Sequence, residues 1–174
     1  MNREETSKVL TILKINYPQS FRSYTNEETY ALLDLWAEAF KNDDAAIVNR
    51  AIKSIVYSDT REFAPNIAQV KAKIYDLIHE GELDEQEAWL LARNAMRHNG
   101  EQAKKEFNKL PEVVKKTIGD YGQLISWALA DTSQLSYIQQ KFFKDFSKTK
   151  EIEKNNFVNQ LTTSNKKLIG GSYE

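Results

Sequence analysis

The sequence predicts an all-α protein, and three observations support this prediction. Apolar residues recur at intervals of three and four along most of the chain, which is the spacing of one helix face. The alternation of apolar and polar residues that strands require is rare. The six Gly and three Pro stand between the periodic segments, where they would end or begin helices. We expect a small N-terminal four-helix domain (1–80), a second helical region with a long C-terminal helix (84–161) and a flexible tail (162–174).

The first two helices of the N-terminal domain are expected before residue 41. The first covers 4–16 and ends at Tyr17-Pro18, because the residue before a proline avoids the α region. Thr25 and Glu28 have the spacing of a capping box, which predicts the start of the second helix. Five residues are expected to form its apolar stripe: Tyr30, Leu33, Trp36, Ala37 and Phe40.

The third and fourth helices complete this domain. Asp43 or Asp44 is placed to cap the third helix, which the polar turn 58–60 would end. Pro65 suits the first position of the fourth helix, and Gly81 suits its end. The expected inward residues are Val48, Ala51, Ile52 and Ile55 in the third helix, and Ile67, Val70, Ile74 and Leu77 in the fourth.

The second region is predicted to begin with short helices. Asp84 caps the first, whose apolar face is Ala88, Leu91, Ala92 and Ala95, and Asn99-Gly100 ends it. Three further segments follow: one with Phe107 and Leu110, one over 111–118 that Gly119 ends, and one over 124–130.

The last helix is predicted to be long. From Ser133 to about Leu161 there is no Gly or Pro, and a fully helical segment of this length would extend about 43 Å. Its apolar stripe is Leu135, Ile138, Phe142 and Phe146. If this stripe is core, Phe142→Ala should cost roughly 3 to 5 kcal/mol.

Composition excludes several classes of function. The chain has 24 Lys+Arg against 25 Asp+Glu, so a strongly basic protein that coats DNA is not expected. Because there is no Cys, zinc fingers, iron–sulfur clusters and thiol catalysis are excluded. No run of about 18 apolar residues predicts a membrane span. We therefore expect a cytoplasmic protein without membrane contact.

No arrangement typical of an enzyme is found. The glycine patterns that cradle phosphates are missing, and His79 and His98 are isolated residues at predicted helix ends. Pairs of acidic residues lie at predicted helix starts, where the helix dipole favours negative charge: Glu4-Glu5, Asp43-Asp44 and Asp84-Glu85 with Glu87. The sequence predicts no catalytic residue, no cofactor and no bound metal.

Two features leave an alternative open. Trp36, Trp89 and Trp127 are expected to be core residues, although tryptophans can also stack on nucleic-acid bases. The chain from residue 132 on has seven lysines and four acidic residues. It has a net positive charge, whereas the rest of the chain taken together has a net negative charge. Its lysines and phenylalanines could contact phosphates or an acidic protein groove, or the lysines could simply form a solvated face: Lys141, Lys144, Lys148, Lys150 and Lys154, with Phe142, Phe143, Phe146 and Phe157.

Residues 4–78 resemble the folded N-terminal domain of the phage replicative-helicase loader and inhibitor family. The resemblance is carried by INYPQSF at 15–21, LLDLWAEAFKNDD at 32–44 and AIKSIVYSDTREFAPNIAQVKAKI at 51–74. Its most telling residues are Trp36, Phe40, Asp43-Asp44, Asp59-Thr60, Phe63, Pro65, Ile67 and Val70. Residues 85–128, with EQEAWLLARNAM and EFNKLPEVVKKTIGDYGQLISWA, also resemble a region of replication proteins from phages of low-GC Gram-positive bacteria.

The resemblance implies a non-catalytic phage DNA-replication accessory protein in the cytoplasm of a bacterial host cell. Such a protein binds a hexameric replicative helicase or its loader, restrains its activity and delivers it to an origin complex, where an origin-binding replication protein would be a further partner. In the family the helicase contact is associated with the region beyond the helical domain. Here this correspondence implies five partner-contact residues: Phe157, Leu161, Lys166, Lys167 and Leu168.

The alternative function is a DNA-binding helical module of a phage replication or regulatory complex. The second to fourth helices could form an arrangement similar to a helix-turn-helix, and the C-terminal part is mildly basic. The almost neutral charge of the whole chain weakens this alternative, and the sequence leaves direct contact with DNA open.

Overall fold

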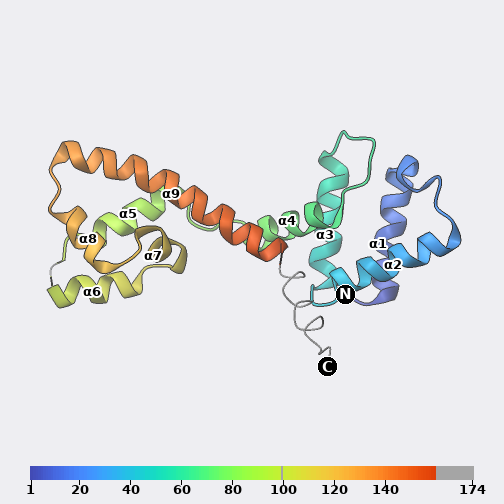
Figure 1. Ribbon diagram of the computed structural model, residues 1–174, viewed down its shortest axis with the longest axis horizontal. Coiled ribbons are helices and arrows are strands. Elements are labelled where there is room, and N and C mark those ends of the chain that lie inside the picture. Colours follow the sequence, from blue (N-terminus) through green and yellow to red (C-terminus); the bar gives the residue numbers. More distant parts are fainter. Residues whose placement is uncertain (99, 160–174) are drawn as a thin grey trace, which may run out of the picture. The chain divides into compact units, whose positions relative to one another are not determined.

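The structure is a computed structural model that describes residues 1–98 and 100–159. Within these residues there are nine α-helices, one short 3-10 helix and no strand, which confirms the all-α prediction. The chain forms two compact units, shown in Figure 1. Within the described residues, the first is Met1–Glu80 together with residues 156–159, and the second is Gly81–Asn155.

The first unit contains four helices, as predicted. They are α1 (Arg3–Asn16), α2 (Asn26–Ala39), α3 (Ala45–Ser58) and α4 (Ile67–Ile78), and the 3-10 helix η1 (Pro18–Phe21) follows α1. The capping box of Thr25 and Glu28 is confirmed. Of the two candidate caps for α3, Asp44 is the one whose carboxylate accepts from backbone N–H groups. Two more capping boxes, which the sequence analysis did not identify, begin α1 at Asn2 and α4 at Asn66.

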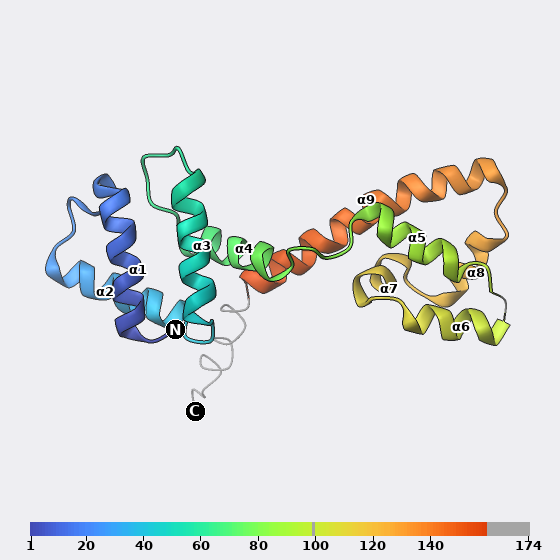
Figure 2. The same ribbon diagram turned by 180° about the vertical axis from the view of Figure 1, so that it is seen from behind.

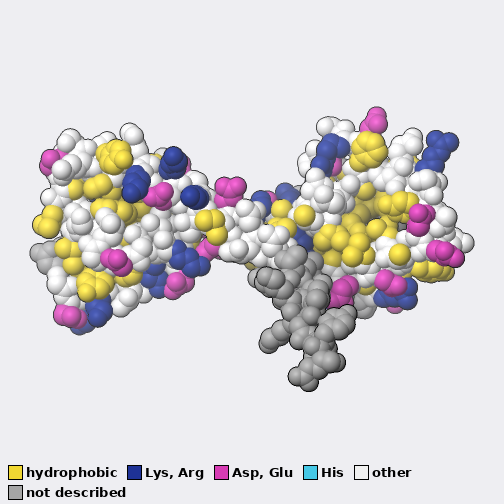
Figure 3. All heavy atoms as spheres, viewed as in Figure 1, with side chains coloured by type: hydrophobic (Ala, Val, Ile, Leu, Met, Phe, Trp, Pro, Cys, Tyr) yellow, Lys and Arg dark blue, Asp and Glu magenta, His cyan; other side chains and the backbone are white. Residues whose placement is uncertain are grey.

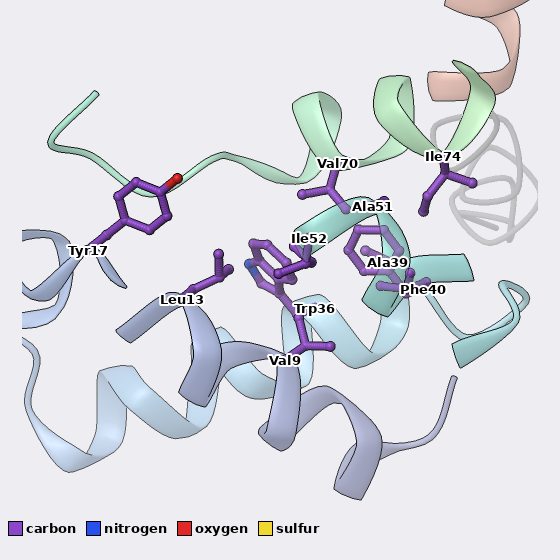
Figure 4. Close-up of a cluster of buried hydrophobic side chains, with 11 residues drawn as sticks. Val9, Leu13, Tyr17, Trp36, Ala39, Phe40, Ala51, Ile52, Val70 and Ile74 are labelled. Atoms are coloured by element: carbon purple, nitrogen blue, oxygen red, sulfur yellow. The ribbon is translucent and has the colours of Figure 1, made fainter. Parts of the chain in front are cut away.

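The core of the first unit lies where these four helices meet, as Figure 4 shows. Trp36 and Phe40 from α2 lie in contact, with ring centroids 5.4 Å apart. Around them the core is completed by Val9, Leu13, Tyr17, Ala39, Val48, Ala51, Ile52, Val70 and Ile74. Burial of these side chains supplies the main stabilising free energy of the unit.

The predicted stripe of α2 is partly wrong. Tyr30 is 62% exposed, and Leu33 and Ala37 are only half-buried. The residues that α2 turns inward are Leu32, Trp36 and Ala39, one position away from part of the predicted set. Both sets have helical spacing, so the packing of the other helices decides between them.

One helix start differs from the prediction, and one of the two candidate caps of α3 has another role. Pro65 is not the first residue of α4, because Asn66 follows it as the N-cap and the helix begins at Ile67. Asp43 does not cap α3, because its carboxylate pairs with Lys71 of α4. Helix α4 ends at Ile78, three residues before the predicted end at Gly81, and Gly81 lies in the turn that follows, with a φ of 85° that glycine adopts readily.

The second unit contains five helices within the described residues. They are α5 (Glu85–Ala95), α6 (Gly100–Lys109), α7 (Glu112–Ile118), α8 (Tyr121–Ala128) and α9 (Thr132–Val158), whose last three residues belong to the first unit. The cap at Asp84 is confirmed, and so is the end of α7 at Gly119, whose φ is 97°.

The structure corrects two helix boundaries in this unit. The prediction that Asn99-Gly100 ends α5 is wrong, because α5 already ends at Ala95 and Gly100 begins α6. Helix α8 begins at Tyr121, three residues before the predicted start, because Asp120 caps it. The predicted tail 162–174 lies outside the described residues.

The core of the second unit is built around α9. Figure 1 and Figure 2 both show α9 running beside α5, and Phe142 of α9 lies 5.3 Å from Trp89 of α5 between ring centroids. Trp127 of α8 meets Phe142 edge to face at 6.1 Å, and Phe146 stacks on Phe142 at 5.9 Å. The prediction that the stripe of the long helix is core is therefore confirmed for both phenylalanines, which are buried.

No helix in the described part of the chain combines the length and the hydropathy needed to cross a membrane.

Candidate functional site

An apolar groove opens on the surface of the first unit. It is formed by α1, η1, α2 and the segment that leads into α4, and its volume is about 540 Å³. Figure 3 shows hydrophobic side chains gathered around this hollow. The residues that matter most for its character are Phe21, Tyr24, Leu32, Leu35, Trp36 and Phe63.

The groove has a buried floor and exposed apolar walls. Leu13 and Trp36 form the floor as members of the core. On the walls, Leu35 is 58% exposed and Phe63 is 67% exposed. Large apolar side chains that line a concave surface in water are typical of a site for another protein's apolar side chains. The groove can therefore bind such side chains without any covalent chemistry.

Local structure fixes the two walls. Pro18 begins η1, and the hydroxyl of Ser20 accepts a hydrogen bond of 2.8 Å from the backbone N–H of Ala64. This bond holds the segment before α4 against η1. Phe21 and Tyr24 pack edge to face with centroids 5.9 Å apart, which stabilises the opposite wall.

A charged cluster holds the loop after α3 beside the end of α1. The Arg61 guanidinium donates to both carboxylate oxygens of Asp59, and the Tyr17 hydroxyl donates to the same carboxylate at 3.2 Å. The hydrogen bonds from Arg61 lower the pKa of Asp59 to about 2. Burial and the neighbouring Asp59 raise the pKa of Tyr17. The loop that carries Phe63 is thus anchored to the core through Tyr17.

Phe157 is the one predicted partner-contact residue that the structure describes. It is half-buried, and its ring lies 5.6 Å from that of Tyr75 on α4. The ammonium of Lys71 lies 6.0 Å from the Phe157 ring and 5.0 Å from that of Phe40. Leu161, Lys166, Lys167 and Leu168 lie outside the described residues.

The residues considered for catalysis lie at structural positions. His79 is the C-cap of α4, and its Nδ1 lies 2.8 Å from the carbonyl of Tyr75. The carboxylates of Glu4, Glu5, Asp84, Glu85 and Glu87 lie at or in the first turns of helices, as predicted. Over residues 1–98 and 100–159, no group of three or more His, Asp and Glu side chains is arranged to hold a metal ion.

The three tryptophans are core residues, as predicted. Trp36 and Trp89 are each 5% exposed, and Trp127 is half-buried against the core of the second unit. The groove was not predicted from the sequence. Leu35 fell outside the predicted stripe of α2, and its position three residues after Leu32 was the available signal that α2 has a second apolar face.

A comparison with protein-family models finds a match within the first unit. Residues 1–71 match the model of the N-terminal domain of a phage helicase loader and inhibitor protein. Residues 1–71 are thus similar to that domain. We name this region the loader-inhibitor domain, and the resemblance stated from the sequence is confirmed for these residues.

The limits of the match are informative. Every residue that lines the groove lies within residues 1–71, so the groove is a feature of the loader-inhibitor domain itself. The match does not include residues 72–174, and the resemblance of residues 85–128 to other phage replication proteins stays a prediction. Searches of curated proteins and of solved structures returned no match.

Proposed function

We propose that this protein is a non-catalytic accessory protein of phage DNA replication that binds a hexameric replicative helicase, restrains it and delivers it to the origin complex. The observation that carries the proposal is the loader-inhibitor domain at residues 1–71. The groove supports it, because an adaptor acts through complementary surfaces and this unit offers an open apolar one. The site of action is the cytoplasm of the bacterial host.

Delivery requires two protein contacts. From the family resemblance, the helicase contact belongs to the chain from Phe157 on, with Leu161, Lys166, Lys167 and Leu168. The groove then serves the second contact, in which an apolar segment of the origin-bound replication protein inserts between the walls that carry Leu35 and Phe63. The two contacts use different residues of the chain.

The helicase contact is tested by capture on the immobilised hexameric helicase of the phage or of its host, in the presence of an ATP analogue. The full chain should be retained. A variant with alanine at Leu161, Lys166, Lys167 and Leu168 should be lost from the helicase. Phe157 stays unchanged in this variant, because it packs on Tyr75 and its removal would also disturb the first unit.

The groove is tested with the double variant Leu35→Lys and Phe63→Lys. Both side chains are more than half exposed, so the fold should persist, and thermal unfolding checks this. This variant should still bind the helicase but should lose the origin-bound replication protein. The matched control is Tyr57→Lys, since Tyr57 is a similarly exposed aromatic residue outside the groove. A full chain that binds no replicative helicase would remove the proposal.

A further inference from the structure

Three lysines form a row on the exposed face of α9. Lys141, Lys144 and Lys148 follow one another at intervals of three and four residues, so their side chains share one face. All three are exposed, and no ion pair joins them to a carboxylate in the described part of the chain. Phe142 and Phe146 are buried on the opposite side of α9, which fixes the lysine face toward solvent.

An aromatic hollow adjoins this row. Tyr137 lies one turn before Lys141 on the same face, and its side chain is 71% exposed. Together with Trp127, Ile138 and Lys141 it lines a hollow of about 650 Å³ between α8 and α9. Exposed aromatic rings beside a row of cations are the combination that single-stranded nucleic acid uses, with bases on the rings and phosphates on the lysines.

The charge of this region differs from that of the rest of the chain. The whole chain has 24 Lys+Arg and 25 Asp+Glu. From residue 132 on there are 7 Lys+Arg and 4 Asp+Glu, which leaves 17 Lys+Arg and 21 Asp+Glu in the rest of the chain. The acidic residues closest to the row on α9 are Asp145, which is half-buried, and Glu151, which is exposed. The protein as a whole is slightly acidic, but the face that carries the row is net positive and therefore attracts an anionic polymer.

We infer that the second unit binds single-stranded DNA along this face, which we name the lysine row: Lys141, Lys144 and Lys148, with Tyr137 at its N-terminal end. A base stacks on Tyr137 in the hollow beside Trp127, and the following phosphates lie along the three lysines. The aromatic hollow favours a nucleic acid over an acidic peptide, because a base gains binding free energy by stacking on an exposed aromatic ring. This activity goes beyond the proposed helicase contact and does not depend on it.

The test is fluorescence anisotropy of a labelled oligothymidine, about 15 nucleotides long, with the full chain. Single-stranded binding weakens with salt by a log–log slope of about 0.7 per neutralised phosphate, so three lysines predict a slope near 2. A fourfold rise in salt should therefore weaken binding roughly 15- to 20-fold. The triple variant Lys141→Gln, Lys144→Gln, Lys148→Gln should lose most of this slope and bind about tenfold more weakly or worse.

The control variant removes the same charge elsewhere. Lys14, Lys53 and Lys105 are also exposed and have no described carboxylate partner, so their change to Gln alters the net charge equally. This control should keep the salt slope. Tyr137→Ala should weaken binding about fivefold or more, whereas Tyr137→Phe and the exposed Tyr57→Ala should not.

Three outcomes would overturn the inference. The first is no binding of the oligothymidine at low salt, and the second is an equal loss in both triple variants. The third is displacement of the DNA by polyglutamate at equal charge concentration, which would assign the row to an acidic protein. Circular dichroism of each variant confirms that the helices persist, and the exposure of the changed residues predicts that they do.

Discussion

The ammonium of Lys71 lies 2.5 Å from a carboxylate oxygen of Asp43, and both side chains are almost buried, at 10% and 11% exposed. The pair joins α4 to the turn before α3, and the rings of Phe40 and Phe157 flank the ammonium. Removal of one partner of a buried ion pair costs much of the free energy of unfolding, because the remaining charge stays buried without a counter-ion. This pair should therefore couple the two helices strongly.

Removing the carboxylate of this pair should destabilise the protein. Asp43→Asn leaves Lys71 charged and without its counter-ion, with an expected loss of about 3 to 5 kcal/mol in the free energy of unfolding. The matched control is Glu38→Gln, which breaks the exposed pair of Glu38 with Lys41 and should cost less than about 1 kcal/mol. Urea denaturation of the three proteins measures both, and equal costs would show that burial of the Lys71 pair is unimportant.

The loop after α3 should make stability depend on pH in the acid range. Asp59 has a pKa of about 2, below its ordinary value of 3.8, so its contribution is fully present above about pH 5. The contribution is lost as the pH falls from about 4 to 2. Asp59→Asn should therefore unfold at lower urea than the unchanged protein at pH 7, and the difference should become much smaller at pH 2, where about half of the Asp59 carboxylates are protonated.

The control for this loop is Glu62→Gln. Glu62 lies three residues after Asp59, and its side chain is exposed. Its urea midpoint should stay close to that of the unchanged protein at both pH values. If Asp59→Asn and the unchanged protein differ by the same amount at pH 7 and pH 2, the hydrogen bonds from Arg61 do not lower the Asp59 pKa.

The long helix should depend on Phe142 for its packing. Phe142 is 1% exposed and lies among the rings of Trp89, Trp127 and Phe146, so Phe142→Ala should cost about 3 to 5 kcal/mol. Tyr137→Ala, on the solvent face of the same helix, should change stability by about 0.5 kcal/mol or less. Chemical denaturation followed by tryptophan fluorescence separates the two, and similar costs would contradict the assigned face of α9.

The start of α5 should depend on the side chain of Asp84. Its carboxylate accepts from the backbone N–H of Glu87 at 2.7 Å, and the Glu87 carboxylate accepts from the backbone N–H of Asp84 in return. Asp84→Ala should cost about 1 kcal/mol, and Asp84→Ser should restore most of it, because serine also caps. An alanine variant as stable as the serine variant, measured by thermal unfolding, would show that the cap contributes little.

Local signals made most of the fold predictable. The caps at Thr25 and Asp84 and the helix end at Gly119 each depend on residues within one turn, which the sequence displays directly. The capping box of Asn66 and Gln69 is an equally local signal. The prediction used Pro65 instead and placed the start of α4 two residues too early. The ends of helices can therefore be predicted from the sequence when all candidate capping residues near each end are compared.

Features that need distant partners could not be predicted. Asp43 precedes a helix and resembles a cap, but its partner Lys71 is 28 residues away. Two faces of α2 have the same helical spacing, and only packing within the core of the first unit selects Leu32 over Leu33 as the inward residue. The groove depends on Ser20 holding the backbone of Ala64, a contact over 44 residues.

The proposed function requires that this protein bind a replicative helicase and catalyse no reaction of its own. The most direct measurement is the rate of ATP hydrolysis by that helicase as the full chain is added. We expect a saturable fall in this rate, and no ATP hydrolysis by the chain alone. An unchanged helicase rate at saturating protein, or ATP hydrolysis in proportion to this protein's own concentration, would contradict it.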